Sequence, residues 1–222
     1  MPAPTTIDPD TELSAVNTIL GAIGQAPITT LDYDSATDTG AFENPEIAFI
    51  YNIFKECNVD VQNEGWHFNK EEYVKKEPDA NKEILVGNNI LRMDFHDPGN
   101  RDHDIIIKSD NGVKKLYDKL EVNSTSNTPF EFDDEIYVDI VYLYEFVDVP
   151  SVFQRYITYK AAARAATQLV GNSTLVQLLT VQEQNARANC MEYECNQGDH
   201  SFFGHPRENT YHSYKPYKSL RR

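Results

Sequence analysis

The 222-residue chain has few cysteines, few basic residues and no long apolar run, and each shortage excludes a class of protein. Its three cysteines, Cys57, Cys190 and Cys195, are odd in number and too few to hold a fold together, so we expect free thiols and a reducing compartment. No stretch approaches the roughly 18 apolar residues of a membrane span. The opening residues, MPAPTTIDPD, lack the basic and apolar regions of a signal peptide. We therefore expect a chain that is made and folded in the cytosol and has no membrane partner.

Basic residues are outnumbered by acidic ones, 20 Lys and Arg against 35 Asp and Glu, which gives a formal net charge of -15. Proteins that wrap nucleic acid neutralise its phosphates with clustered Lys and Arg. The charge balance therefore argues against a body that binds nucleic acid. In contrast, hydrophobic residues make up 40% of the chain, and 13 Tyr, 11 Phe and one Trp are typical of a folded protein.

The sequence signatures of common enzymes are missing: there is no G-x-S-x-G, no Walker phosphate loop and no dinucleotide fingerprint. The segment GAIG (21–24) has the outline of a loop that clamps nucleic-acid backbone. It lies at the end of a predicted helix without basic neighbours, so we interpret it as a helix cap.

Two segments contain residue types that could bind a metal. DFHDPGNRDHD (94–104) supplies oxygen and nitrogen ligands for a divalent cation, but the same residues suit a polar hairpin tip, the interpretation we favour. Cys190, Cys195, His200 and His205 recur at intervals of five, whereas structural zinc sites favour closer pairs. We therefore expect core cysteines and predict no metal, no cofactor and no catalytic residue.

The N-terminal third predicts two helices. The first begins near Asp10 or Thr11 and ends at Gly24, and Pro27 prevents its continuation. The second is announced by Asn44-Pro45, a capping side chain followed by the residue best suited to the first helical position, and it continues until Gly65. We expect the two helices to form an antiparallel pair. The apolar stripes that predict them comprise Leu13, Val16, Leu20 and Ile23 in the first helix and Ile47, Ile50, Phe54, Cys57 and Val61 in the second.

From Trp66 to about Val149 short β-type runs are separated by turn residues, as in SDNG (109–112). These runs predict a small antiparallel sheet or barrel, and we expect Trp66 to be buried where the β region begins. Residues 150–172, with Pro150 before an Ala-rich interior and Gly171 after it, predict a third helix, and a fourth runs from about Ser173 to Asn196. The predicted fold is α+β. A helical body (1–65 and 150–203) carries an inserted antiparallel β lobe (66–149) and an extended basic arm (204–222).

Five blocks of the chain resemble a known family. They are ELSAVNTILGAIGQAPITTL (12–31), VDVQNEGWHFN (59–69), PDANKEILVGNNILRMD (78–94), PSVFQRYITYKAAARAATQLVGN (150–172) and CMEYECNQGDHSFF (190–203). In this order they resemble successive segments of the tail tubular protein A family of short-tailed bacteriophages. EGWHFN and LSAVNTILGAIGQAP are the most distinctive. Residues 32–42 and 123–132 carry no signal of the family.

The resemblance implies a structural virion protein, the head-to-tail adaptor or gatekeeper. Such an adaptor is a ring, usually of twelve copies, between the portal protein and the tail nozzle, a protein of tail tubular protein B type. It would be assembled in the host cytoplasm and would form part of the conduit through which DNA passes without specific binding. The family fold, a helical body joined to a β-rich lobe, is similar to the fold predicted from the residues.

Two segments are candidates for contact with partners. Residues 128–148 contain seven acids and no base, and we single out Asp133, Asp134, Glu135 and Asp139 as candidates to face a DNA channel, where like charge would keep the duplex mobile. The alternative is a solvated strand face. The arm carries a charge of +4 and regularly spaced tyrosines, and we expect it to bind a neighbouring protein rather than DNA. Its candidate interface residues are Arg207, Tyr211, Tyr214, Lys215, Tyr217, Lys218, Arg221 and Arg222.

Two other functions remain open from the sequence. The first is a tail-associated enzyme that degrades polysaccharide, because phage tails meet cell-surface glycans, although no pair of acidic residues specifically supports it. The second is an unrelated acidic chaperone or scaffold, which the five ordered blocks disfavour. The adaptor is therefore the preferred hypothesis.

Overall fold

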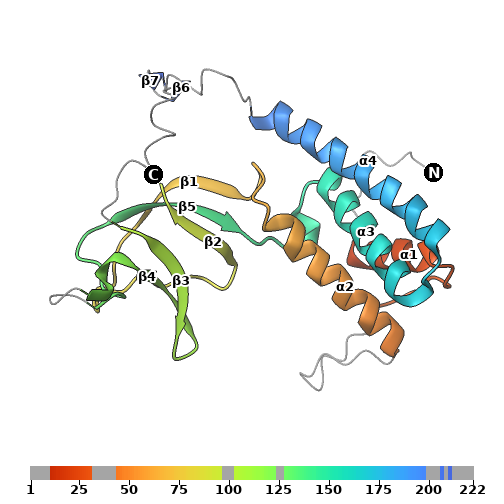
Figure 1. Cartoon of the computed structure of the whole chain (residues 1–222), viewed down its shortest axis with the longest axis horizontal. Helices are drawn as coiled ribbons and strands as arrows, with labels where there is room; N and C mark the ends of the chain where they lie inside the picture. Colours follow the sequence, from red (N-terminus) through yellow and green to blue (C-terminus); the bar gives the residue numbers. More distant parts are fainter. Residues whose placement is uncertain are drawn as a thin grey trace, which may run out of the picture. The chain divides into compact units, whose positions relative to one another are not determined.

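A computed structural model of the chain describes residues 11–31, 44–96, 103–123 and 128–198, together with short strands at 206–207 and 210–211. The chain divides into two compact units. The helical unit comprises Met1–Glu64 and Tyr144–Glu194, and the β unit comprises Gly65–Leu143 and Cys195–Arg222. Four α-helices and antiparallel strands within the described residues confirm the predicted α+β class (Figure 1). None of the helices that are described is both long and apolar enough to cross a membrane.

Helix α1 (Glu12–Ala22) has the ends that the sequence predicts. The Thr11 hydroxyl accepts a hydrogen bond from the N–H of Ser14 at 3.2 Å. After the helix, Gly24 adopts a φ of +79°, and the N–H of Gln25 donates to the carbonyl of Leu20. The interpretation of GAIG as a helix end is therefore confirmed. The buried residues of the helix are Ala15, Val16, Ile19 and Leu20, so Val16 and Leu20 are buried as predicted, whereas Leu13 and Ile23 are only partly buried.

Helix α2 (Pro45–Gln62) begins at the predicted cap, where the side-chain oxygen of Asn44 accepts a hydrogen bond from the N–H of Glu46 at 2.9 Å. It runs antiparallel to α1, as expected. Glu12, at the start of α1, bonds to residues in the middle of α2, whereas Gln25, beyond the end of α1, bonds to Glu46. The buried face of α2 comprises Ile50, Ile53, Phe54, Cys57, Asn58, Val61 and Gln62.

Helix α3 (Ser151–Ala165) is the central helix of the helical unit and is buried on most of its circumference. It is followed by a single π-helical turn, η3 (Ala166–Val170), in which the N–H of Gly171 donates to the carbonyl of Ala166. Gly171 then ends the helix with a φ of +65°, as predicted. The sequence pattern predicted one uninterrupted helix, so the π turn is a feature that it missed.

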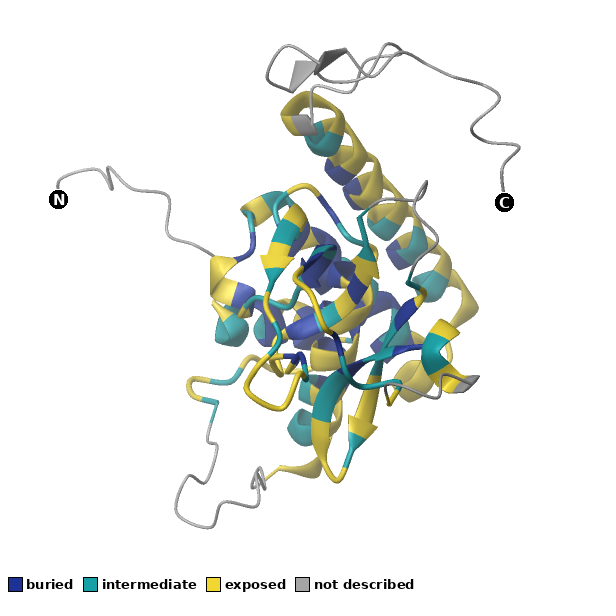
Figure 2. Cartoon of the chain, turned by 90° about the vertical axis from the view of Figure 1, so that its left-hand side faces the viewer, coloured by how far each residue is buried: buried dark blue, intermediate teal, exposed yellow. Residues whose placement is uncertain are grey.

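Helix α4 (Ser173–Gly198) runs antiparallel to α3. The thiol of Cys190 contacts the carbonyl of Val152 near the start of α3. Leu179 packs with Ala163 and Ala166 at the other end. Only three of the α4 side chains that the structure describes are fully buried, Leu179, Ala186 and Cys190. Figure 2 shows this helix, which leads to the C-terminal segment, as exposed over most of its length.

The β unit contains a three-stranded antiparallel sheet in which β5 (Ile136–Tyr142) lies between β1 (Lys70–Lys76) and β2 (Ile90–Phe95). A hairpin of β3 (Ile105–Asp110) and β4 (Val113–Asp118) turns at Asn111-Gly112. Both turn residues have positive φ, which confirms the turn predicted at SDNG. The hairpin and the sheet share one core, formed by Ile84, Val86, Ile90, Met93, Ile105, Leu116, Phe132, Ile136, Val138 and Ile140.

Two predicted β runs are shorter than expected. Residues 66–69 form a turn before β1, and beyond Tyr142 the chain leaves the sheet and forms the 3₁₀ turn η2 (Phe146–Asp148). A second 3₁₀ turn, η1 (Leu120–Asn123), follows β4.

The distinctive segment EGWHFN has a structural role at the edge of the sheet. Trp66 is 5% exposed, so its predicted burial is confirmed. Asn69 is fully buried. Its side chain accepts a hydrogen bond from the N–H of Trp66 at 2.9 Å and donates one to the carbonyl of Tyr142 at 2.8 Å. The N–H of Tyr142 in turn donates to the carbonyl of Asn69. These bonds join the turn before β1 to the end of β5.

Candidate interaction surfaces

The four acidic candidates lie on β5 or directly before it, and three of them have ionic or hydrogen-bonding partners. Asp133 pairs with Lys82 and Glu135 with Lys75, each at 2.6 Å. The bond from Lys75 is the main reason that the pKa of Glu135 is lowered. Asp139 is half-buried and lies 2.6 Å from Nδ1 of His96, while Asp134 is exposed. These residues therefore form a mixed ionic surface rather than a purely acidic one, and their position along a DNA channel stays a prediction.

The C-terminal arm is described in part. Strands β6 (Pro206–Arg207) and β7 (Thr210–Tyr211) pair antiparallel, so the candidates Arg207 and Tyr211 lie on neighbouring strands. The remaining six candidates lie outside the described residues: Tyr214, Lys215, Tyr217, Lys218, Arg221 and Arg222. The role of the arm as an interface stays a prediction.

The cysteines are free thiols, as expected, but their placement differs. Cys57 and Cys190 are buried, and burial raises the pKa of Cys57 to about 11 and that of Cys190 to about 12. Both therefore behave as core residues. Cys195 is exposed, so the expectation that it lies in the core is wrong. The helical pattern around Cys195 could not show this, because α4 packs on α3 through one face only.

The histidines considered for a metal site engage two different aspartates. His96 pairs with Asp139, and Nδ1 of His103 lies 2.6 Å from the buried carboxylate of Asp118. Of the other candidates, Asp97, Asp102, His200 and His205 lie outside the described residues. In the part of the chain that is described, no three His, Cys, Asp or Glu side chains are grouped as metal ligands.

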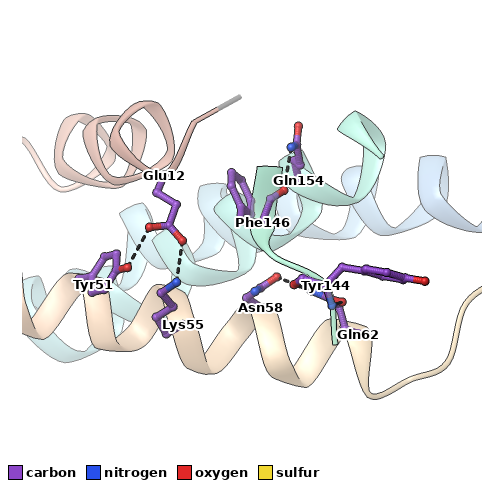
Figure 3. Close-up of polar contacts among 8 residues, drawn as sticks. All are labelled: Glu12, Tyr51, Lys55, Asn58, Gln62, Tyr144, Phe146 and Gln154. Carbon is purple, nitrogen blue, oxygen red and sulfur yellow. Dashed lines mark hydrogen bonds and ion pairs between the residues drawn. The ribbon is translucent and has the colours of Figure 1, made fainter. Parts of the chain in front are cut away.

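The helices of the helical unit are joined by polar contacts as well as by their core (Figure 3). The carboxylate of Glu12 on α1 accepts hydrogen bonds from the Tyr51 hydroxyl at 2.8 Å and from Lys55 Nζ at 2.6 Å on α2. From α4, Arg187 donates to both carboxylate oxygens of Glu64 and to the hydroxyl of Tyr156. Such contacts between elements add to the core packing that places the helices within this unit.

Two open hollows on the helical unit have volumes of about 410 and 400 Å³ and share Lys55 in their walls. The first is also lined by Glu56, Val59, Asp60 and Arg164, and Arg164 forms ion pairs with both Glu56 and Asp60. The second is also lined by Glu12, Glu145, Phe146 and Val147. Most of these charged groups are engaged in ion pairs that hold helices together, which is a structural role.

The helical unit has an exposed apolar surface that was not predicted from the sequence. Residues 165–182, from the end of α3 through η3 into α4, contain no charged side chain, although a quarter of the whole chain is charged. We call this segment the uncharged corner. Its exposed apolar side chains are Leu169, Val170, Leu178 and Val181, with Leu178 as much as 62% exposed.

The uncharged corner ends at Gln182, because the next part of α4 carries exposed charged side chains such as Arg187 and Glu192. Met191 is also exposed on this part of the helix, one turn after Arg187. Depletion of charge together with exposed apolar side chains is typical of a surface that binds another protein. The run of 18 residues without a charge does not by itself identify this surface in the sequence, because residues 13–31 are also uncharged.

The family model described as "Tube: Tail tubular protein" matches residues 13–200. This range includes most of both units and the whole uncharged corner. Among curated proteins no match was found.

Proposed function

Because the chain belongs to the tail tubular protein family and is thus a structural protein of a phage tail, we propose that it is the adaptor that joins the portal to the tail nozzle. In this proposal identical copies form a closed ring, dodecameric as the resemblance implies, at the head-to-tail junction of the virion. The helical body (1–65 and 150–203) is the wall of the ring, and the β lobe (66–149) and the arm (204–222) supply further contacts. The ring is assembled in the host cytoplasm.

The uncharged corner is the observation that carries this proposal. Identical subunits close a ring when two different patches of each subunit meet, and such patches must be rigid. The corner supplies an exposed apolar patch on helices that pack on a common core and are also joined by ion pairs of Glu12, Arg164 and Arg187. Its occupant in the proposed ring is an adjacent copy of the chain.

The net charge of -15 supports a role in the conduit for DNA. A wall that does not neutralise phosphates does not hold the duplex, so DNA can move through it. We further propose that the protein has no catalytic role. Incubation of the purified protein with capsular polysaccharide tests this point, because release of reducing ends would support the enzyme hypothesis instead.

The experiment is a mass measurement of the purified chain alone and mixed with portal protein. We expect a complex with many copies of the chain per portal ring. Leu178→Glu and Val181→Glu should melt like the wild type, because both side chains are exposed, but they should lose assembly. Asn52→Glu adds the same charge at an exposed position of α2 and is the matched control. One isolated copy per vertex would contradict the ring, and normal assembly of both corner variants would contradict the role of the corner.

The arm has a separate test. Deletion of residues 205–222 should leave the subunit folded, and attachment to the portal or to adjacent subunits should weaken, most strongly at low salt, where the charge of the arm is least screened. Sedimentation of the mixture with portal at two salt concentrations measures this. Equal assembly by the truncated and the full chain would show that the arm is not an interface.

A further inference from the structure

The β unit has an exposed aromatic cluster on its sheet that the proposed ring wall does not use. The cluster consists of Tyr73 on β1, Tyr137 on β5 and His96 directly after β2. The rings of Tyr73 and Tyr137 are stacked, with centroids 4.4 Å apart and planes 13° apart. The ring of His96 lies edge-on to Tyr73, with centroids 5.0 Å apart. Tyr73 is 54% exposed, so its ring faces solvent rather than the core.

The backbone beneath the cluster is strained. Tyr73 lies in a β-bulge between Glu71 and Val74 and has a φ of +61°, a conformation that bulky side chains rarely adopt. The carboxylate of Asp139 holds this geometry, because it accepts the N–H of Tyr73 at 3.1 Å and lies 2.6 Å from Nδ1 of His96. Strain of this kind is typical of positions that serve binding.

Three carboxylates and one lysine lie around the cluster, so its surroundings are acidic on balance: Lys75 is directly opposite Tyr137 on β1 and pairs with Glu135 at 2.6 Å. Asp94 and Asp139 are directly opposite each other on β2 and β5, a pairing of like charges that costs free energy. Glu135 accepts a hydrogen bond from the hydroxyl of Tyr137. An aromatic face beside carboxylates is suited to an arginine or lysine side chain, which can stack on the rings and pair with the acids.

We propose that the aromatic cluster is the docking site for the basic arm, residues 205–222, of a neighbouring copy of this chain. The arm carries Arg207, Lys215, Lys218, Arg221 and Arg222 against Glu208, a charge of +4, so it complements this face. The assignment to a neighbour rests on the proposed ring, in which each copy offers one patch and accepts another. The contact of Tyr73 with a basic side chain explains why a strained tyrosine is held in solvent.

The test uses the full chain, diluted so that the arm of a neighbouring copy does not occupy the site. A fluorescein-labelled peptide of residues 205–222 takes the place of that arm. Anisotropy measures binding to the wild type and to Tyr73→Gly. Glycine accepts a positive φ, so this variant removes the ring without adding strain, and its unfolding temperature should stay within a few degrees of the wild type. Tyr117→Leu, which removes another partly exposed tyrosine of the β unit, is the matched control.

We expect saturable binding to the wild type, about tenfold weaker binding to Tyr73→Gly and binding within about twofold of the wild type for Tyr117→Leu. A peptide in which Gln replaces Arg and Lys should bind weakly to all three. Absence of binding to the wild type, or equal binding to Tyr73→Gly, would overturn the proposal. Binding only to a chain that lacks its own residues 205–222 would assign the site to the arm of the same copy.

The proposed docking site and the proposed adaptor function can be contradicted independently. A chain that binds the peptide through Tyr73 but does not assemble with portal would contradict the adaptor alone. A chain that assembles with portal, while Tyr73→Gly leaves peptide binding unchanged, would contradict the docking site alone.

Discussion

The side-chain amide of Gln62 forms two hydrogen bonds with the backbone of Tyr144, 82 residues further along the chain (Figure 3). It donates to the carbonyl at 2.9 Å and accepts from the N–H at 2.8 Å, and it also donates to Asn58. The Gln62 side chain thus supplies to Tyr144, which lies just beyond β5, the two backbone hydrogen bonds that a neighbouring strand would supply within the sheet. This pairing joins the end of α2 to the segment that leads into α3.

Gln62→Leu should lower the free energy of unfolding by about 2–4 kcal/mol, because it leaves the N–H and the carbonyl of Tyr144 without these partners inside the protein. Chemical denaturation followed by circular dichroism measures the change. Asn52→Leu, at an exposed position of the same helix, should change stability by less than about 0.5 kcal/mol. Equal effects of the two substitutions would contradict a structural role for the Gln62 amide.

Gly24 and Gly65 have the same φ of +79°. Alanine substitutions at the two positions therefore distinguish the cost of backbone strain from the cost of steric crowding. A Cβ at Gly65 would lie 2.9 Å from Nη2 of Arg92 and 3.2 Å from Cγ2 of Val141, whereas a Cβ at Gly24 would meet nothing within 4 Å. Gly24→Ala should therefore cost about 1–2 kcal/mol for the left-handed conformation alone. Gly65→Ala should cost about 2–4 kcal/mol, because overpacking is added. Unfolding curves that coincide for the two variants would show that the side chains near Gly65 move aside.

Trp66→Ala should cost about 3–5 kcal/mol, because the indole is 5% exposed and its removal leaves a large cavity. The fluorescence of this single tryptophan offers an independent check, since a buried indole emits at shorter wavelength than one in water. A solvent-like emission maximum in the wild type, together with an unchanged unfolding temperature in the variant, would contradict the prediction.

Asp118 should make the β unit sensitive to acid. Burial by itself would raise the pKa of this carboxyl, but His103 and the N–H groups of Leu120 and Asp104 outweigh burial, and the pKa is lowered from 3.8. A lowered pKa in the folded state means that Asp118 stabilises the fold above pH 3.8 and that this contribution is lost as the pH falls through the lower folded value.

Asp118→Asn should therefore reduce stability near neutral pH by about 1–3 kcal/mol and flatten the acid side of the stability curve. Urea denaturation between pH 2.5 and 7, values chosen to span roughly the carboxyl titration range, measures both effects. Asp104→Asn, whose side chain is largely exposed, is the control and should keep the slope of the wild type. An unchanged slope in Asp118→Asn would contradict the prediction.

Local signals in the sequence predicted most of the secondary structure. Helix ends followed from Thr11, Asn44 and Gly171, and the hairpin turn followed from Asn111-Gly112, because each of these residues has a side chain or a φ that its position requires. The order of the strands could not be predicted, since nothing local places β5 between β1 and β2. The buried polar residues Gln62 and Asn69 were also missed, because the backbone groups of Tyr144 and Tyr142 that they bond are more than 70 residues away.

The candidate surfaces were predicted less well than the fold. The uncharged corner is visible in the sequence as a run without charge, but its exposure depends on how α4 packs on α3. The exposure of Tyr73 depends on a bulge that shifts it out of the alternation of β1, a shift that periodicity does not predict. The pairing of Asp133 and Glu135 with lysines depends on contacts between segments more than 50 residues apart.

The central position of β5 has a consequence for synthesis of the chain on the ribosome. Strands β1 and β2 both pair with β5 and not with each other, so the sheet cannot form until residues 136–142 have been translated. The helical unit waits longer, because α1 and α2 pack on a central helix that begins at Ser151. Premature termination before Ile136 therefore yields neither unit, and a chain that ends before Ser151 lacks the helical unit that the proposed ring requires.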